Sequence, residues 1–144
     1  MMKNWSLVFL FMICGVLYVS CGSDNDAQIC DQRVVIDATE YTTAPMDALV
    51  IGSLTFNGDC LEITFSAGGC DGKSWELKLI DSGAISESLP PQRNLILSLK
   101  NDEFCEALIT QTLTVDIAPL QIEGSSIQLN LVNTGDEILY TYGS

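Results

Sequence analysis

The sequence predicts an all-β domain over residues 33–144, an antiparallel β-sandwich of seven to eight strands. Apolar and polar residues alternate in several short runs, which is the pattern of strands with one buried face. Glycine, asparagine and proline turn signals separate these runs, and no stretch has the apolar spacing of an amphipathic helix. Short strands with a single apolar face suit two sheets that close on a shared core.

The first half of the domain contains four expected strands. They cover residues 33–39, 49–56, 61–66 and 74–80. Asn57-Gly58 joins the second strand to the third, because both residues tolerate the positive φ that a tight hairpin turn requires. Residues 41–47 and the glycine-rich stretch 67–72 are expected loops.

The second half of the domain repeats the same pattern of short alternating strands. We expect strands at residues 94–100, 107–117, 127–131 and 138–142. A long loop is expected over Asp81–Arg93, with Pro90-Pro91 stiffening its end. The turn signals at 123–126 and 133–136 separate the last three strands.

The N-terminal residues 1–20 predict an export signal. Lys3 precedes an apolar run from Trp5 to Val19, which at 15 residues is short for a membrane-spanning helix of ~20 residues. A positive charge before a short apolar segment is the build of a secretory signal. The small residue Ser20 stands directly before Cys21, where a signal peptidase requires a small side chain.

The region around Cys21 resembles a bacterial lipoprotein signal, in which the cysteine becomes the acylated first residue. Such signals favour leucine three residues before the cysteine, where this chain has Tyr18 and Leu17 lies one position further back. An uncleaved membrane anchor is the alternative. The resemblance implies a signal peptide at 1–20, then a lipidated cysteine and acidic tether at 21–32.

Acidic residues follow the cysteine directly, in the tract Ser23–Asp26. This tract resembles a feature of Bacteroidota-type lipoproteins that directs display on the outer face of the outer membrane. The alternative is a solvated linker, which any tether requires. The expected location is therefore the outer membrane, lipid-anchored, at the cell surface or on the periplasmic face.

The net charge of the chain excludes one class of partner. The formal charge is −13, and it becomes −14 beyond residue 20, because residues 1–20 hold one of the six basic residues and none of the 19 acidic ones. Nucleic-acid binding requires a basic patch, which this chain lacks. An anionic membrane surface would repel the domain, so attachment to the membrane is expected through the N-terminal lipid alone.

Four cysteines follow Cys21: Cys30, Cys60, Cys70 and Cys105. An even number in an exported chain predicts two disulfides. Cys60 and Cys70 bracket an expected strand that would separate them by ~30 Å, whereas a disulfide needs Cα atoms within about 7 Å. Two pairings remain open, Cys30–Cys60 with Cys70–Cys105 or Cys30–Cys70 with Cys60–Cys105. A zinc site is disfavoured because no C-x-x-C pair is present, and no metal or cofactor is expected.

Three short motifs carry a resemblance to a known group. They are Gly68-Gly69-Cys70, Pro90-Pro91-Gln92 and Cys105-Glu106-Ala107. Together they resemble small bacterial lipoproteins with an uncharacterised immunoglobulin-like β-sandwich, and the chain is also similar to the C-terminal sandwich of NigD-like lipoproteins. The matching segment, 58–120, covers about half of the mature chain.

The resemblance implies an immunoglobulin-like fold and a disulfide between Cys70 and Cys105, which would leave Cys30 to pair with Cys60. Members often have a histidine three residues after the cysteine of the first motif, and this chain has Lys73 there. The group has no assigned activity. The resemblance therefore supports the fold and leaves the function open.

The residue inventory argues against catalysis. No histidine is present, which removes histidine-based triads, histidine metal sites and the usual base near neutral pH. Lys73 and Ser74 are adjacent, and adjacent strand residues point to opposite faces. Trp75 could stack on a sugar ring, but its phase with Leu77 and Leu79 places it in the core.

We therefore expect a lipid-anchored, non-enzymatic binding or assembly module with an envelope or extracellular protein or glycan as partner. The loops Gly68–Lys73 and Asp81–Arg93, at one end of the sandwich, are the expected contact surface. The alternative is a small glycan-binding or glycan-hydrolysing surface domain. A solvent-exposed Trp75 would favour that alternative, and a buried Trp75 would count against it.

Overall fold

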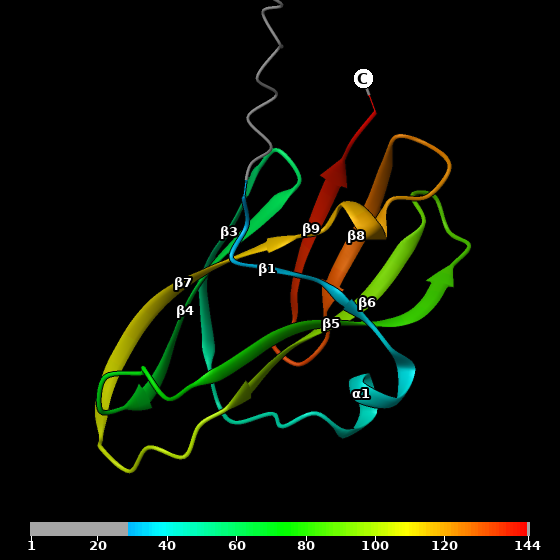
Figure 1. Ribbon diagram of the computed structural model, residues 1–144. Coiled ribbons are helices and arrows are strands. Elements are labelled where there is room, and N and C mark those ends of the chain that lie inside the picture. Colours follow the sequence, from blue (N-terminus) through cyan, green and yellow to red (C-terminus); the bar gives the residue numbers. More distant parts are fainter. Residues whose placement is uncertain (1–28, 144) are drawn as a thin grey trace, which may run out of the picture.

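The computed structural model describes residues 29–143, which form two β-sheets packed face to face (Figure 1). The predicted all-β sandwich is confirmed. The predicted signal peptide, Cys21 and most of the tether lie outside the described residues. Among those described, no helix is long and apolar enough to cross a membrane.

The first sheet has four strands in the order β1-β7-β4-β3. These strands are β1 (Gln32–Arg33), β7 (Ala107–Asp116), β4 (Cys60–Gly69) and β3 (Val50–Asn57). β3 and β4 form the hairpin predicted at Asn57-Gly58, with Asn57 opposite Cys60 and a φ of 58° at Gly58. β4 then pairs with β7 along its whole length without a register shift.

The second sheet has five strands in the order β2-β5-β6-β8-β9. These strands are β2 (Val35–Ile36), β5 (Glu76–Ser86), β6 (Gln92–Lys100), β8 (Ser126–Leu131) and β9 (Asp136–Thr141). A short 3-10 helix, η1 (Ala118–Leu120), connects β7 to the segment before β8.

Two details of the strand prediction are wrong. The described residues hold nine strands, because the predicted run 33–39 is split into β1 at the edge of the first sheet and β2 at the edge of the second. Val34 lies buried at the crossover between them. The sheets are also mixed, since β1–β7, β2–β5 and β6–β8 pair in parallel and the other four pairs are antiparallel.

The described part of the chain also forms an α-helix that the sequence pattern does not predict, α1 (Ala38–Thr43). Asp37 caps its start, because Oδ1 of Asp37 accepts the backbone N–H of Glu40 at 2.7 Å. None of its six residues is buried, so it has no apolar stripe by which periodicity could reveal it.

The long loop predicted at Asp81–Arg93 is wrong as well. β5 continues to Ser86 and β6 begins at Gln92, with a register shift between Asp81 and Ile85. Gly83 has a φ of 80° inside this irregular stretch. A bulge of this kind interrupts the alternation on which the prediction depended.

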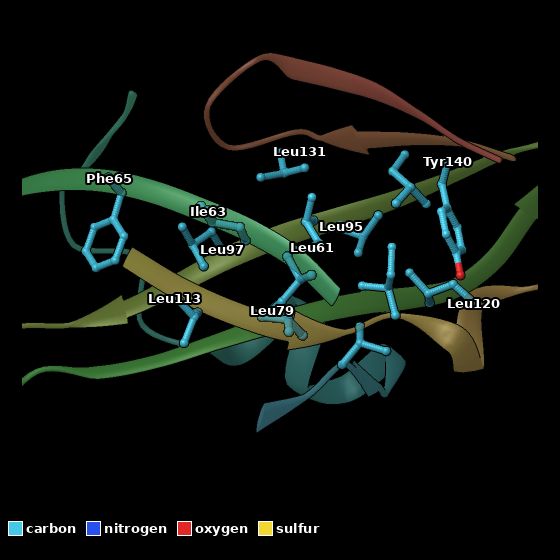
Figure 2. Packing of buried hydrophobic residues seen from close by; sticks show 14 of the residues in the cluster. Leu61, Ile63, Phe65, Leu79, Leu95, Leu97, Leu113, Leu120, Leu131 and Tyr140 are labelled. Atoms are coloured by element: carbon cyan, nitrogen blue, oxygen red, sulfur yellow. The ribbon is translucent and has the colours of Figure 1, made fainter. Parts of the chain in front are cut away.

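The core lies between the inner faces of the two sheets (Figure 2). Leu61, Ile63 and Phe65 of β4 are fully buried there, as the alternation predicts. Leu95 and Leu97 of β6 face them from the second sheet, and Tyr140 of β9 closes one end. Leu99 of β6 is also fully buried. Burial of each such side chain contributes about 1.5–3 kcal/mol, which is the main stabilising term of the sandwich.

Candidate functional site: a disulfide-closed loop cluster

Two loops meet at the end of the sandwich where β4 and β6 finish. Residues 70–75 connect β4 to β5, and residues 101–106 connect β6 to β7. The Cys70–Cys105 disulfide joins the loops, with 4.8 Å between the two Cα atoms. We call these two segments the loop cluster.

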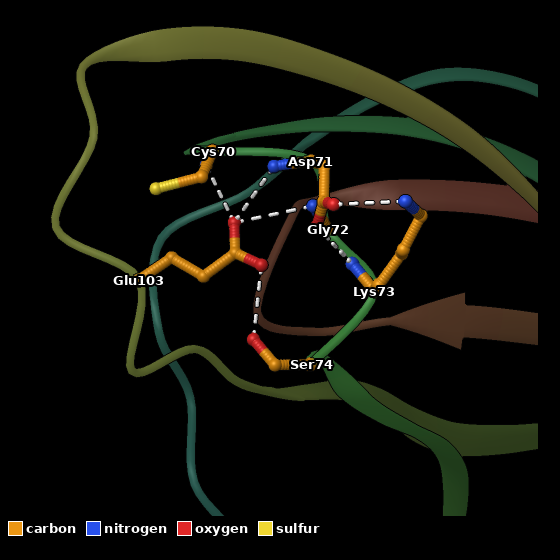
Figure 3. A network of polar contacts seen from close by, with 6 residues as sticks. All are labelled: Cys70, Asp71, Gly72, Lys73, Ser74 and Glu103. Atoms are coloured by element: carbon orange, nitrogen blue, oxygen red, sulfur yellow. Dashed lines mark hydrogen bonds and ion pairs between the residues drawn. The ribbon is translucent and has the colours of Figure 1, made fainter.

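The carboxylate of Glu103 lies at the centre of the loop cluster (Figure 3). Its Oε2 accepts the backbone N–H groups of three consecutive residues, Cys70 at 2.5 Å, Asp71 at 3.2 Å and Gly72 at 3.1 Å. Its Oε1 accepts the hydroxyl of Ser74 at 2.9 Å. Consecutive amides that converge on one point form an anion-binding nest, and here the chain fills that nest with its own carboxylate.

These contacts also set the ionisation of Glu103. Loss of hydration raises the pKa of the carboxyl group, but the hydrogen bonds from Cys70, Gly72, Ser74 and Asp71 together outweigh that effect. The pKa therefore lies below the ordinary value of 4.5. The side chain is ionised at neutral pH and is unsuited to act as a general acid there.

The glycines predicted as a turn have specific steric roles in this cluster. A Cβ at Gly69 would lie 2.5 Å from Glu103 Oε2 and 2.8 Å from Trp75 Cζ2, closer than real contacts. Gly72 has a φ of 68°, which disfavours any residue with a Cβ, and a Cβ there would also collide with Gln111. Only glycine lets the backbone approach the carboxylate this closely.

Lys73 and Ser74, which the sequence analysis places on opposite faces, lie in the loop before β5 and contact different carboxylates. The Nζ of Lys73 lies 3.1 Å from Oδ2 of Asp71, and both side chains are exposed. The hydroxyl of Ser74 instead donates to Glu103. Ser74 therefore has a carboxylate of lowered pKa as its partner, which is a weak base for activating a hydroxyl.

Trp75 is the last residue of the first loop, and its side chain belongs to the core. It is 8% exposed, and its ring centroid lies 6.0 Å from that of Phe65, with 43° between the ring planes. The predicted core position is confirmed. Trp75 has no open face on which a sugar ring could stack.

The second predicted contact loop lies at the opposite end of the molecule, so the expectation that both loops share one end is wrong. The loop 87–91 joins the end of β5 to the start of β6, whereas 70–75 leads into the start of β5 (Figure 1). Leu89, Pro90 and Pro91 line a shallow depression there together with Glu123 and Leu139. The depression is open and holds no buried polar group.

A second cavity lies outside the loop cluster, between α1 and the outer face of β5 and β6. Its volume is about 250 Å³, and four charged side chains line it: Glu40, Glu76, Lys78 and Lys100. Each lysine is paired, Lys78 with Glu40 and Lys100 with Glu76, the latter at 3.0 Å. The sequence gives no signal for this cavity, because it depends on the short helix α1.

The remaining predicted site residues are cysteines. Cys30 pairs with Cys60, with 5.8 Å between their Cα atoms, and Cys70 pairs with Cys105, which is the combination that the resemblance implies. Cys21, the predicted lipidation site, lies outside the described residues. Within residues 29–143, no group of three or more cysteine, aspartate and glutamate side chains could hold a metal ion.

Sequence reasoning did not identify Glu103 or its nest. Glu103 is one of 19 acidic residues and stands in no recognisable motif. Its position depends on a contact between segments 31 to 33 residues apart, closed by a disulfide. The nearest signal is the pair Gly69 and Gly72 around a cysteine, since such glycines mark close backbone approach.

No family model and no curated protein matches the chain. Two solved structures are similar to it: a protein of unknown function, DUF1344, from Bacteroides vulgatus and a protein labelled toxin-related from Parabacteroides distasonis. Their TM-scores are 0.54 and 0.56, at 16% and 14% sequence identity, and each match covers 78% of this chain. The chain spans 57% and 60% of those two chains, so the likeness shows the fold alone.

Proposed function

We propose that the protein is an exported lipoprotein, anchored through Cys21, that acts as a non-enzymatic binding or assembly module at the outer membrane. The pair of disulfides carries this proposal. Disulfides persist in oxidising compartments outside the cytoplasm, which agrees with the predicted export signal. The resemblance to small lipoproteins, including NigD-like ones, points the same way.

The position of the first disulfide suits an anchored domain. Cys30 follows the predicted lipid-bearing Cys21 by nine residues and is bonded to Cys60 at the start of β4. A pull on the tether would therefore be borne by a covalent link to a central strand. Without this link, the start of the described chain would be held by the two-residue strand β1 and by the hydrogen bonds between Asp31 and Thr114.

The loop cluster supports a binding role over a catalytic one. Both oxygens of Glu103 accept hydrogen bonds from the chain's own groups, and Ser74 is one of the donors. No unengaged acid, base or nucleophile remains at the centre of that cluster. The burial of Trp75 likewise counts against the alternative glycan-directed function.

The test of the anchor is the intact mass of the mature protein. We expect a chain that begins at Cys21 and carries acyl groups, and Cys21→Ser should remain unprocessed. Cys14→Ser is the matched control, because it changes a cysteine within the signal and should leave acylation intact. An unmodified Cys21 in the mature protein would overturn the anchoring proposal.

The test of location is protease treatment of intact cells, with lysed cells as the control. Loss of the domain from intact cells would place it on the cell surface, and survival until lysis would place it in the periplasm. Both results agree with an envelope module. Recovery of the protein in the cytoplasmic fraction with reduced cysteines would contradict it.

A further inference from the structure

Among residues 29–143, no strand pairs with the outer edge of β7 over the seven residues 107–113, which we call the open β7 edge. On one side β7 pairs with β4 from Ala107 to Asp116. On the other side β1 pairs only with Val115 and Asp116, and Figure 1 shows β1 beside that end of β7 alone. At about 3.3 Å per residue, the open β7 edge is roughly 20 Å long.

Neighbouring contacts show which backbone groups face outward along the open β7 edge. The amide of Thr114 donates outward to Asp31 Oδ2 at 2.9 Å, and the carbonyl of Asp116 accepts from the Val34 amide at 3.0 Å. Backbone groups of alternate strand residues point to the same side. The N–H and C=O groups of Leu108, Thr110 and Thr112 therefore point away from β4 and are available to an added strand.

The described N-terminal residues contact the outer side of β7 only as far as Thr114 and do not continue along residues 107–113. Asp31 contacts Thr114, but the preceding Cys30 is disulfide-bonded to Cys60 of β4, on the far side of β7. The disulfide thus holds Cys30 against β4 rather than along the outer side of β7. Residues 107–113 have no pairing partner on their outer side among residues 29–143.

The other sheet edges carry features that block strand addition. β3 has a register shift between Ile51 and Ser53, and β9 has acidic residues at Asp136 and Glu137. The edge of β5 is partly covered by β2 and α1. Residues 107–113 contain no charge, no proline and no register shift, which are three of the usual protections against pairing.

Charge at the two ends of the open β7 edge defines the partner. Glu106 directly precedes it and is exposed, and Asp31 lies at its far end beside Thr114. The pKa of Asp31 is lowered by hydrogen bonds from the backbone and hydroxyl of Thr114, so this carboxylate stays ionised. An uncharged strip between two anions fits a strand with a basic residue at each end.

We propose that the open β7 edge binds an extended segment of a partner protein, uncharged at its centre and basic at both ends, which adds to the first sheet as a further strand. The proposal deepens the proposed function, because it names the partner class of the binding module. Backbone hydrogen bonds would supply affinity, and the flanking carboxylates would supply selectivity. The exposed Leu108 side chain offers an apolar contact on the outer face.

A second copy of this chain is the less suitable occupant. Two β7 strands paired antiparallel about Thr110 would bring Glu106 of one copy towards Asp31 of the other, so that like charges meet at both ends. The net charge of −13 per chain adds to that repulsion. Charge complementarity instead favours a basic segment.

The test uses the processed, lipid-bearing protein in neutral detergent and three synthetic peptides. The first has seven alternating threonine and valine residues between two pairs of lysines, the second has glutamates in place of the lysines, and the third is the first with alternate backbone nitrogens methylated. We expect the lysine-ended peptide to bind at least about tenfold more tightly than either control, with an affinity that falls as salt is added.

Amide hydrogen exchange then locates the binding. Leu108, Thr110 and Thr112 should become protected when the lysine-ended peptide is added. Ile109 and Gln111, whose amides face β4, should change little. Protection elsewhere, or no protection at any of the three outward amides, would overturn the proposal.

Thr110→Pro provides the matched change in the protein. It removes an outward N–H while leaving the β4–β7 ladder intact, and proline is tolerated on strand edges. We expect peptide affinity to fall about tenfold or more, whereas Thr110→Val, which keeps the amide, should bind like the native protein. Equal binding by the two variants would contradict strand addition. If Thr110→Pro fails to fold, the amide hydrogen exchange experiment on the unmodified protein still tests the proposal.

The outcomes separate this inference from the proposed function. If the protein carries lipid on Cys21 but does not bind the peptides, the proposed envelope role stands and the proposed β7 site is overturned. Protection of the same three amides that grows with protein concentration alone would indicate self-association and overturn the basic partner. If the mature protein carries no lipid but still binds the lysine-ended peptide, the proposed β7 site stands and the proposed anchor is overturned.

Discussion

The guanidinium of Arg93 and the carboxylate of Asp81 form an ion pair inside the sandwich, with 3.0 Å between Nη1 and Oδ1. The side chains are 7% and 0% exposed. Arg93 Nε also donates to the carbonyl of Leu120, and Oδ1 of Asp81 accepts the amide of Gly83. Burial raises the pKa of the Asp81 carboxyl group, against the opposing effect of Gly83 and Arg93. The pair thus connects β5, β6 and η1 at one end of the core.

Removal of one partner should be strongly destabilising. We expect Arg93→Met to lower the free energy of unfolding by about 3–5 kcal/mol, because it leaves a buried carboxylate without its counter-charge. The double variant with Asp81→Leu should recover most of that loss. Urea unfolding monitored by circular dichroism measures the free energy of unfolding of both variants. A single variant as stable as the native protein would show that the pair contributes nothing.

Glu103 should make stability depend on pH in the acid range. Its pKa in the folded state lies below the ordinary 4.5, so its contribution is present above that value and is lost as the pH falls through the folded pKa. We expect Glu103→Gln to be less stable at neutral pH and to lose less stability on acidification. Glu106→Gln, a nearby exposed position, is the control and should follow the native curve. If the free energy of unfolding fell equally with acid pH in the native protein and in Glu103→Gln, the role of the carboxylate would be refuted.

Local sequence signals predicted the β3–β4 hairpin and the central strands well. Asn57-Gly58 sets the turn from its own backbone preferences, and Leu61, Ile63 and Phe65 reveal their buried face by strict alternation. Both signals involve residues close together in the chain. The all-β fold followed from them without any long-range information.

Apart from the short helix α1, which has no apolar stripe, the missed features depend on contacts between distant segments. The run 33–39 reads as a single strand, yet its start pairs with β7 in the first sheet and its next residues pair with β5 in the second. Glu103 and its nest lie on two separate loops, which the pairing of β4 with β7 and the disulfide bring together. The polar residues in the second half of β5 look like a loop in the sequence, because the pairing of Asp81 with Arg93 of β6 cannot be read from local composition. Tertiary contacts overrode the local pattern in each case.

Tyr140 should titrate late and contribute through its hydroxyl. Burial, together with the hydrogen bond to Asp59, raises its pKa to about 12, although Gln121 opposes the shift. The stability that depends on the protonated hydroxyl is therefore complete below pH 10 and is lost as the pH rises through about 12. Ultraviolet difference titration should show a late-ionising component that is reduced in Tyr140→Phe; the pKa of Tyr41 is raised as well, by burial and by the charge of Asp81. That variant should lose about 1–2 kcal/mol, since Asp59 and Gln121 both bond the hydroxyl.

The Cys70–Cys105 disulfide should stabilise the domain and hold the loop cluster together. Its two cysteines are 35 residues apart, so replacing both by serine should cost about 2–4 kcal/mol, largely by freeing the unfolded chain. Amides of residues 70–72 should also exchange faster, because Glu103 would no longer be held beside them. The Cys30→Ser/Cys60→Ser variant is the control, since it should lose comparable stability while those amides keep their protection. Unchanged exchange after loss of Cys70–Cys105 would show that the nest forms without the disulfide.

Trp75 provides the most direct test of the core against a glycan-binding surface. At 8% exposure it should emit at short wavelength and resist quenching by acrylamide in the native state, and urea should abolish both properties. Trp5 belongs to the predicted signal peptide, so the mature protein should report Trp75 alone. Trp75→Phe keeps an aromatic ring against Phe65 and should fold with a modest loss of stability, whereas Trp75→Ala should lose about 3–5 kcal/mol. If soluble glycans shifted the emission and protected Trp75 from quenching, the ring would be accessible and the glycan-directed alternative would regain its stacking platform.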